Sequence, residues 1–195
     1  MSGRRSLVDL IGAKIMSSLS PAPHEDAFAA AGIRGHDYQI DLDPLPGRRL
    51  EHLLAAVKAA GFETVAFPCK QAVMPLLNEI SADAQQIGAV NSITIANDDR
   101  TVGYNTNRTG LRRSFEGALG RACVEGNVIY TPIETQLIKT ARAVGARVLT
   151  GGGMCVHQAA ETFRLFTGVP PDVERMHRTF AAALAERDAA QATAA

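Results

Sequence analysis

Short apolar segments alternate with helical segments along almost the whole chain, and glycine ends several of the helical ones. In the first half, this pattern predicts strands over residues 7–15, 38–42 and 64–67 and helices over residues 24–31 and 50–60. Gly32 and Gly61 directly follow these two helices, at the position where a helix C-terminus favours glycine. Strands that alternate with helices typically form a mostly parallel sheet covered by helices. The sequence therefore predicts an α/β fold.

The second half of the chain keeps this alternation and adds one hairpin. Strands over residues 89–96 and 101–105 flank the turn from Asn97 to Arg100, which is a strong hairpin signal. The other predicted elements are helices over 71–79 (kinked at Pro75), 109–119, 134–144, 151–167 and 172–185 and short strands at 128–130 and 147–149. We expect the tail after Arg187 to fray.

The composition excludes several classes of protein. The 195 residues contain 20 Lys and Arg against 20 Asp and Glu, so the formal net charge is zero, unlike that of a typical nucleic-acid-binding protein. No apolar run reaches the ~18 residues that a membrane-spanning helix needs. The cysteines (Cys69, Cys123 and Cys155) are too few for a disulfide framework or a zinc site, and Cys69 and Cys155 are expected to be small core residues. We expect a cytoplasmic protein without nucleic-acid or membrane partners.

Two loops that follow predicted strands carry candidate site residues. Ser18 and Ser20 stand beside Pro21 at a helix start, where their hydroxyls either cap the helix or bind a carboxylate. Lys70 comes just after a buried strand, at the strand end where α/β folds build their sites. A cation is unfavourable at a helix N-terminus, so the position of Lys70 there needs a reason. Lys70 is either a solvated side chain at the helix start or a residue with a function.

Amides and glycines mark further places along the chain. Asn91 and residues 103–107 bring amides and a hydroxyl to strand ends, a composition that is also common in turns. Residues 151–153 are three glycines at a helix start, but without a G-x-G-x-x-G or G-K-[S/T] motif they are a weak phosphate-loop signal. His157 and Glu161 lie one helical turn apart with no third ligand nearby, so we expect a surface pair and no metal site.

Five sequence motifs follow one another between residues 11 and 168. They are IGAKIMSSLSPAPHE (11–25), FPCKQAVMPLL (67–77), QIGAVNSI (86–93), GYNTNRTGL (103–111) and the stretch from VIYTPIETQL to FRLFTG (128–168). Together they resemble the shikimate/quinate dehydrogenase family, and the last stretch is most similar to its quinate/shikimate branch. The resemblance covers about residues 10–180.

This resemblance implies a three-layer, shikimate-dehydrogenase-like substrate domain over residues 1–116. A connector at 117–127 would then lead into a vestigial Rossmann strand–helix–strand and C-terminal helices over 128–187. In the family, a dinucleotide-binding domain with a Gly-rich turn stands at this place. Since one βαβ unit needs ~30 residues, the connector is too short to hold it. We therefore expect no NAD or NADP bound in the family's way, and no other cofactor.

The resemblance also assigns roles, with one departure at Asn107. The family has an aspartate there, which shuttles a proton together with the catalytic lysine that Lys70 matches. An amide cannot accept that proton, and without a carboxylate partner the pKa of Lys70 should fall. The expected catalytic residues are therefore Lys70 and Asn107.

The substrate-binding residues are carried over by position. Ser18 and Ser20 would hold a substrate carboxylate, and Asn91 would reach a ring hydroxyl. Tyr130 and Gln158 would close the pocket. Thr64 and Ala66 stand where the family has residues that contact ring hydroxyls, so we expect a substrate other than shikimate. The expected substrate-binding set is Ser18, Ser20, Thr64, Asn91, Tyr130 and Gln158.

Three functions follow as hypotheses. The leading one is a cofactor-independent enzyme of dehydratase, isomerase or tautomerase type, in which Lys70 acts on a 3-dehydroshikimate-like hydroxy- or oxo-carboxylate as a base or a Schiff-base amine. The first alternative is a non-catalytic binder of such an acid. The second is the remnant of an NAD(P)-dependent dehydrogenase that needs a partner chain.

Because the strand–helix–strand at 128–149 would expose sheet edges, we also expect a homodimer, or a different docking of this fragment onto the substrate domain.

Overall fold

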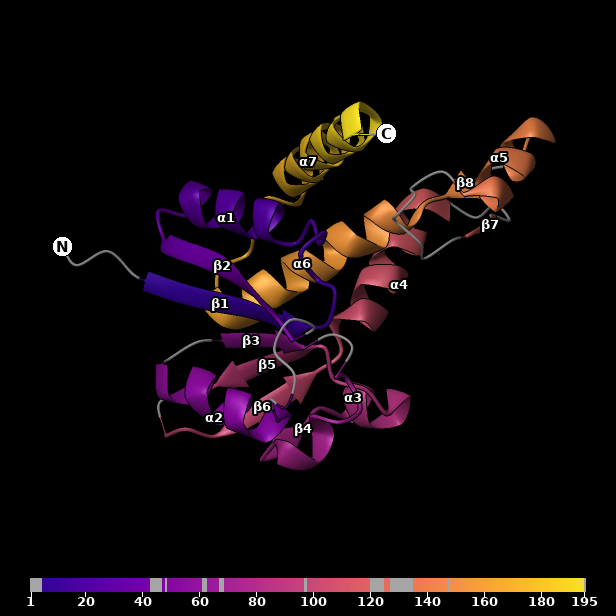
Figure 1. Ribbon diagram of the computed structural model, residues 1–195. Helices are drawn as coiled ribbons and strands as arrows, with labels where there is room; N and C mark the ends of the chain where they lie inside the picture. Colours follow the sequence, from indigo (N-terminus) through magenta and orange to yellow (C-terminus); the bar gives the residue numbers. More distant parts are fainter. Residues whose placement is uncertain are drawn as a thin grey trace.

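The computed structural model describes residues 5–42, 47, 49–60, 63–66, 69–96, 98–119, 125–126, 135–146 and 148–194. A six-stranded sheet lies at the centre of the described molecule (Figure 1). Its strands are β1 (Arg5–Gly12), β2 (Arg34–Asp41), β3 (Glu63–Ala66), β4 (Glu79–Ile80), β5 (Ser92–Ile95) and β6 (Thr101–Tyr104), in the order β2-β1-β3-β5-β6-β4.

Five strands of this sheet run in one direction and β5 runs against them. β1 pairs in parallel with both β2 and β3, and β4 pairs in parallel with β6. β5 is antiparallel to β3 and to β6, so the predicted hairpin is confirmed. The mostly parallel sheet with its helices confirms the α/β fold.

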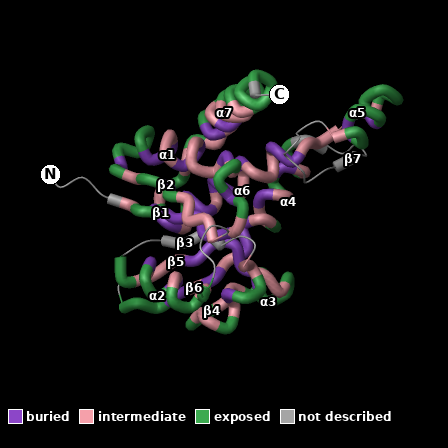
Figure 2. The backbone as a smooth tube through the Cα atoms, viewed as in Figure 1, coloured by how far each residue is buried: buried purple, intermediate pink, exposed green. Residues whose placement is uncertain are grey.

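Helices cover both faces of the sheet, because the apolar side chains of β1 alternate between two cores. Val8 belongs to a cluster with residues of α1 (Pro21–Ala30), α6 (Gly151–Thr167) and α7 (Val173–Ala194). Ile11 points the other way, into a cluster with residues of α2 (Leu50–Ala60) and α3 (Ala82–Ile87). The buried residues accordingly gather around the sheet and along α6 (Figure 2).

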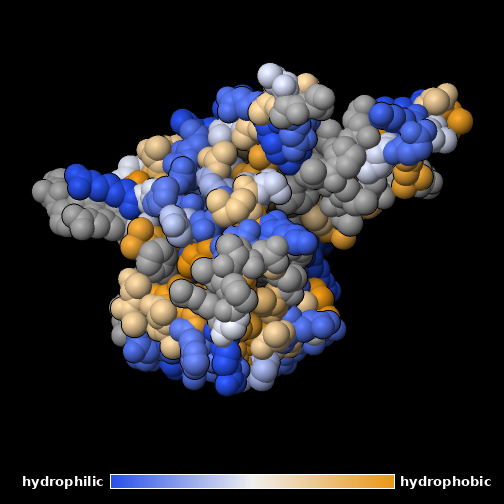
Figure 3. All heavy atoms as spheres, viewed as in Figure 1, coloured by the Kyte–Doolittle hydropathy of each residue, from blue (hydrophilic) through white to orange (hydrophobic). Residues whose placement is uncertain are grey.

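A small second unit lies beyond α4 (Thr106–Leu119) and α6, away from the six-stranded sheet (Figure 1). It holds α5 (Gln136–Ala143) and a two-stranded parallel sheet of β7 (Glu125–Gly126) and β8 (Val148–Leu149). Hydrophobic residues appear at the outer end of α5 in Figure 3. Leu137 of this helix and Val144 directly after it are 54% and 78% exposed.

Three local predictions differ from the structure. The helix predicted over residues 71–79 is only a 3-10 turn, η1 (Met74–Leu76), which leads into β4. The helix α3 was not predicted; it begins after Ser81, whose hydroxyl accepts a hydrogen bond from the backbone of Ala84. The expected fraying after Arg187 is wrong, because α7 continues to Ala194. The strand predicted at 128–130 lies outside the described residues.

No helix in the described part of the chain combines the length and the apolar character needed to cross a lipid bilayer.

Candidate functional site

The sheet topology explains why motifs far apart in the sequence meet. β1, β3 and β6 end at one edge of the sheet, and the reversed strand β5 begins at that same edge. The loop after β1, the turn after β3, Asn91 before β5 and the start of α4 after β6 therefore all face one region. Ligands of open α/β sheets bind at such a carboxyl edge.

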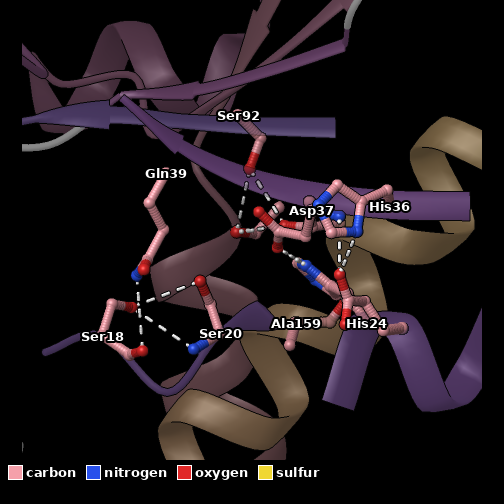
Figure 4. A network of polar contacts seen from close by, with 11 residues as sticks. Ser18, Ser20, His24, His36, Asp37, Gln39, Ser92 and Ala159 are labelled. Atoms are coloured by element: carbon pink, nitrogen blue, oxygen red, sulfur yellow. Dashed lines mark hydrogen bonds and ion pairs between the residues drawn. The ribbon is translucent and has the colours of Figure 1, made fainter. Parts of the chain in front are cut away.

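The loop between β1 and α1 presents two hydroxyls. Ser20 precedes α1 but makes no side-chain capping bond, so capping is not its role. Instead, the Ser18 hydroxyl donates to Ser20 Oγ over 3.2 Å and accepts from the Ser20 backbone N–H over 3.3 Å. The Gln39 amide donates to the carbonyl of Ile15 over 3.0 Å and to the carbonyl of Ser18 over 3.4 Å, which ties this loop to β2. Figure 4 shows the contact between Gln39 and Ser18.

Asn91 and the first residues of α4 form a closed set of hydrogen bonds. The Asn91 side-chain oxygen accepts from the backbone N–H of Thr106 over 2.7 Å. The Asn91 amide donates to Thr106 Oγ1 and to Asn107 Oδ1, both over 2.9 Å. The two asparagines predicted for the site are therefore in direct contact.

Lys70 lies in the turn that follows β3, and its carbonyl accepts a hydrogen bond from the backbone of Val90 over 2.8 Å. Burial lowers the pKa of the Lys70 ammonium, and the nearby Cys155 opposes this shift. Burial also raises the pKa of the Cys155 thiol to about 12, so Cys155 is a protonated thiol at neutral pH and not a nucleophile.

The lowered pKa of Lys70 predicts a shifted reactivity profile. Because only the neutral amine reacts with acylating reagents, we expect half-maximal labelling of Lys70 at a pH below the usual lysine value of about 10.4. Burial slows the reaction at every pH and leaves the midpoint unaffected. Competitive acetylation followed by mass spectrometry of the Lys70 peptide measures this midpoint. A midpoint at or above the ordinary lysine value would show that the side chain is solvated.

These groups line one pocket of about 280 Å³. Among the sequence-predicted residues, it contains Ser18, Ser20, Lys70, Asn91, Asn107 and Gln158. Tyr130 lies outside the described residues. Thr64 lies in β3 opposite Asp9 of β1, and its side chain is outside the described part.

The sequence analysis missed a buried pair in the same pocket wall. His24 of α1 and Asp37 of β2 both line the pocket, and His24 Nδ1 lies 2.6 Å from Asp37 Oδ2 (Figure 4). The other ring nitrogen, Nε2, lies 3.2 Å from the carbonyl of Ala159 in α6. Since the Ala159 carbonyl can only accept, Nε2–H donates to it, and the contact at Nδ1 joins the ring to the Asp37 carboxyl group. The pair joins three elements around the pocket.

The glycine run and the His157–Glu161 pair make contacts within the protein. A Cβ on Gly153 would lie 2.3 Å from the Ser114 hydroxyl, so this glycine lets α6 approach α4 closely. His157 packs edge-on against His177, with ring centroids 5.3 Å apart, and Glu161 pairs with Arg164 and Arg113. The described residues contain no group of three side chains that could hold a metal ion.

Comparisons with known proteins match both parts of this architecture. A family model described as "Shikimate dehydrogenase substrate binding domain" matches residues 10–93, and one described as "Shikimate 5'-dehydrogenase C-terminal domain" matches residues 151–179. The quinate/shikimate dehydrogenase (NAD(+)) of Corynebacterium efficiens is 32% identical, over 89% of this chain and 97% of the relative. The chain belongs to the shikimate/quinate dehydrogenase family.

Solved structures of the shikimate/quinate dehydrogenase family agree with the fold. Quinate dehydrogenase from Corynebacterium glutamicum in complex with NAD superposes with a TM-score of 0.86 at 28% identity, over 92% of this chain and 100% of that one. The shikimate 5-dehydrogenase of Thermus thermophilus in complex with NADP(H) and shikimate gives a TM-score of 0.82 at 22% identity, over 91% of this chain and 99% of that one. The second likeness concerns the fold alone.

The family assignment corrects the predicted reaction class. The relatives are named as NAD(+)- or NADP(+)-dependent dehydrogenases, which are oxidoreductases. The expectation of a cofactor-independent lyase or isomerase is therefore wrong. It rested on Asn107 and on the short connector, which are departures from the family within a chain that otherwise follows it.

The residues present do not fit a dinucleotide. Residues 120–134, between α4 and α5, read GRACVEGNVIYTPIE and contain no G-x-G-x-x-G turn. Their described part is the two-residue strand β7, whereas a βαβ unit takes about 30 residues. The alignment with the Corynebacterium efficiens enzyme runs over 275 positions, more than the 195 residues of this chain. That relative therefore contains a stretch with no counterpart here.

Proposed function

We propose that this chain is the substrate-binding part of a shikimate/quinate-type dehydrogenase, and that hydride transfer requires a nucleotide-binding domain from another chain. The pocket would take a ring carboxylate of the shikimate or quinate type. The observation that carries this proposal is the convergence of Ser18, Ser20, Lys70, Asn91, Asn107 and Gln158 on one pocket.

The pocket chemistry suits such a ligand. The Ser20 hydroxyl is a neutral donor for a carboxylate, and rotation of the Ser18 hydroxyl away from Ser20 frees a second one. Lys70 adds a positive charge in a half-buried position, where charge attraction is stronger than in water. The amides of Asn91, Asn107 and Gln158 offer donors and acceptors to ring oxygens. Apolar neighbours such as Leu10 and Phe180 complete the wall and shield these polar contacts from water.

The partner requirement rests on the missing stretch. Relatives of this chain are named for NAD(+) or NADP(+), while the sequence of residues 120–134 contains no G-x-G-x-x-G motif. The division into a substrate domain at 1–116, a connector at 117–127 and a vestigial fragment at 128–187 belongs to this proposal. The homodimer also stays a prediction, since the short strands β7 and β8 leave edges that another chain could cover.

Ligand binding tests the proposal without any nucleotide. In isothermal titration calorimetry, we expect shikimate or quinate to bind, and Ser18→Ala and Ser20→Ala each to weaken binding about tenfold, as expected for one hydrogen bond to a charged group. Thr193→Ala is the control, because its hydroxyl bonds only within the exposed end of α7. Absence of binding by both acids would overturn the proposal. Reduction of NAD(+) or NADP(+) by the chain alone with either acid would overturn the partner requirement.

A further inference from the structure

The orientation of the two pocket asparagines follows from one backbone contact. The Thr106 N–H can only donate, so the atom of Asn91 that it meets at 2.7 Å must be the amide oxygen. The opposite end of the Asn91 amide is then Nδ2, which can only donate. Its contact at 2.9 Å with Asn107 must therefore be to the Asn107 oxygen.

A ring of hydroxyls holds this orientation in place. Ser92 and Thr106 lie 3.3 Å apart, Ser92 and Thr162 3.0 Å apart, and Thr106 and Thr162 3.2 Å apart, measured between hydroxyl oxygens. All three residues are buried. Each hydroxyl can donate to the next around the ring, while Thr106 also accepts from Asn91. Turning Asn91 over would place its NH₂ against the Thr106 N–H and leave two buried donors facing each other.

The Nδ2 end of Asn107 is consequently the end left for a ligand. The Asn107 side-chain oxygen accepts a hydrogen bond from the Asn91 amide. Within the described part of the chain, the Asn107 NH₂ group donates no hydrogen bond. Asn107 is half-buried and lines the pocket together with Lys70. A protonated Lys70 also only donates. Two donor groups thus line the same pocket, at the positions where the resemblance implies a lysine and an aspartate.

We propose that the ring position facing Asn107 and Lys70 is recognised as a carbonyl oxygen, so that the site selects the keto form of the ring carboxylate over the hydroxy form. This inference rests on the proposed function and names the oxidation state of its ligand. A ketone oxygen accepts from both groups. A hydroxyl at the same place carries a proton that needs an acceptor, and neither the Asn107 NH₂ nor the Lys70 ammonium is one. Because a buried donor without a partner costs free energy, the hydroxyl should bind more weakly.

A matched pair of ligands tests the selection. The probes are shikimate and 3-dehydroshikimate, which differ by oxidation of one ring hydroxyl to a ketone. They are titrated calorimetrically without nucleotide, at a pH below the labelling midpoint of Lys70, so that its amine is protonated. We expect the wild type to bind the ketone about tenfold more tightly, a difference of about 1.4 kcal/mol. Asn107→Asp should abolish or reverse this preference, because one carboxylate oxygen keeps the bond from Asn91 while the other accepts a hydroxyl proton and repels a ketone oxygen.

The control is Gln85→Glu, which makes the same amide-to-carboxylate change on the exposed face of α3, outside the pocket. It should keep the wild-type preference. Asn107→Ala serves as a second variant; it removes the NH₂ donors without adding a charge and should bring the two affinities together. Equal binding of both acids by the wild type, or an unchanged preference in Asn107→Asp, would overturn this inference alone. Binding of neither acid would overturn the proposed function and this inference with it.

Discussion

Replacing Asp37 with alanine is expected to lower the free energy of unfolding by about 1–3 kcal/mol, the usual cost of leaving a buried hydrogen-bonding group without its partner. The side chains of His24 and Asp37 are 5% and 2% exposed. Without the carboxyl group, the buried Nδ1 of His24 loses the partner that lies 2.6 Å from it. Chemical denaturation followed by circular dichroism measures the loss.

A second His–carboxylate pair on the same two elements provides the control. His36 of β2 and Glu25 of α1 are also in contact, but their side chains are 61% and 40% exposed. Exposed pairs contribute about 0–1 kcal/mol, so His36→Ala should change the unfolding free energy far less than Asp37→Ala. Similar losses in both variants would contradict the buried hydrogen bond as the cause and point to a general effect on the contact between α1 and β2.

The sheet and the site could be predicted for a common reason. Lys70 and the Ser18–Ser20 loop follow predicted strands, and parallel strands bring their carboxyl ends to one edge. Asn91 joins them because β5 runs in the reverse direction, which places the start of that strand at the same edge. The family resemblance grouped these residues in the sequence, and the strand directions explain why they face one region.

Other features depend on contacts that no local pattern reveals. Pro75 lacks an N–H, so the segment at 74–76 forms only a short 3-10 turn with bonds such as Leu76 N–H to the Val73 carbonyl. Asn78 then bonds Thr101, which draws the following residues into the sheet as β4. The extension of α7 was open to prediction, since alanine is the strongest helix former and this tail is rich in it.

The His24–Asp37 pair illustrates the limit most clearly. His24 follows Ser20 in an ordinary helical pattern, and Asp37 lies in a strand whose burial does not alternate cleanly. Only the packing of α1 against β2 and α6 makes His24 meet Asp37 and the Ala159 carbonyl. Aspartate is also a residue that lies mostly at protein surfaces, and histidine is only intermediate in burial.

Gly110→Ala is expected to lower the unfolding free energy by about 2 kcal/mol, within the range for overpacked interiors. A Cβ at Gly110 would lie 2.7 Å from both the Gln158 nitrogen and the Met154 oxygen of the α6 backbone. Because backbone atoms cannot rotate away, α4 and α6 must separate. Met154 and Gln158 line the pocket, so the same shift should weaken binding of shikimate or quinate.

The same helix contains its own control, because Gly117 is exposed and a Cβ there meets nothing within 4 Å. Gly117→Ala should therefore stabilise the protein by up to about 1 kcal/mol through helix propensity alone. Its effect on binding should be negligible, since Gly117 does not line the pocket. Opposite signs of the two alanine substitutions in thermal or chemical denaturation would show that the close approach of α4 to α6 requires glycine at position 110. Stabilisation by both would mean that the helices can separate at no cost, and that the position of Gln158 does not depend on this contact.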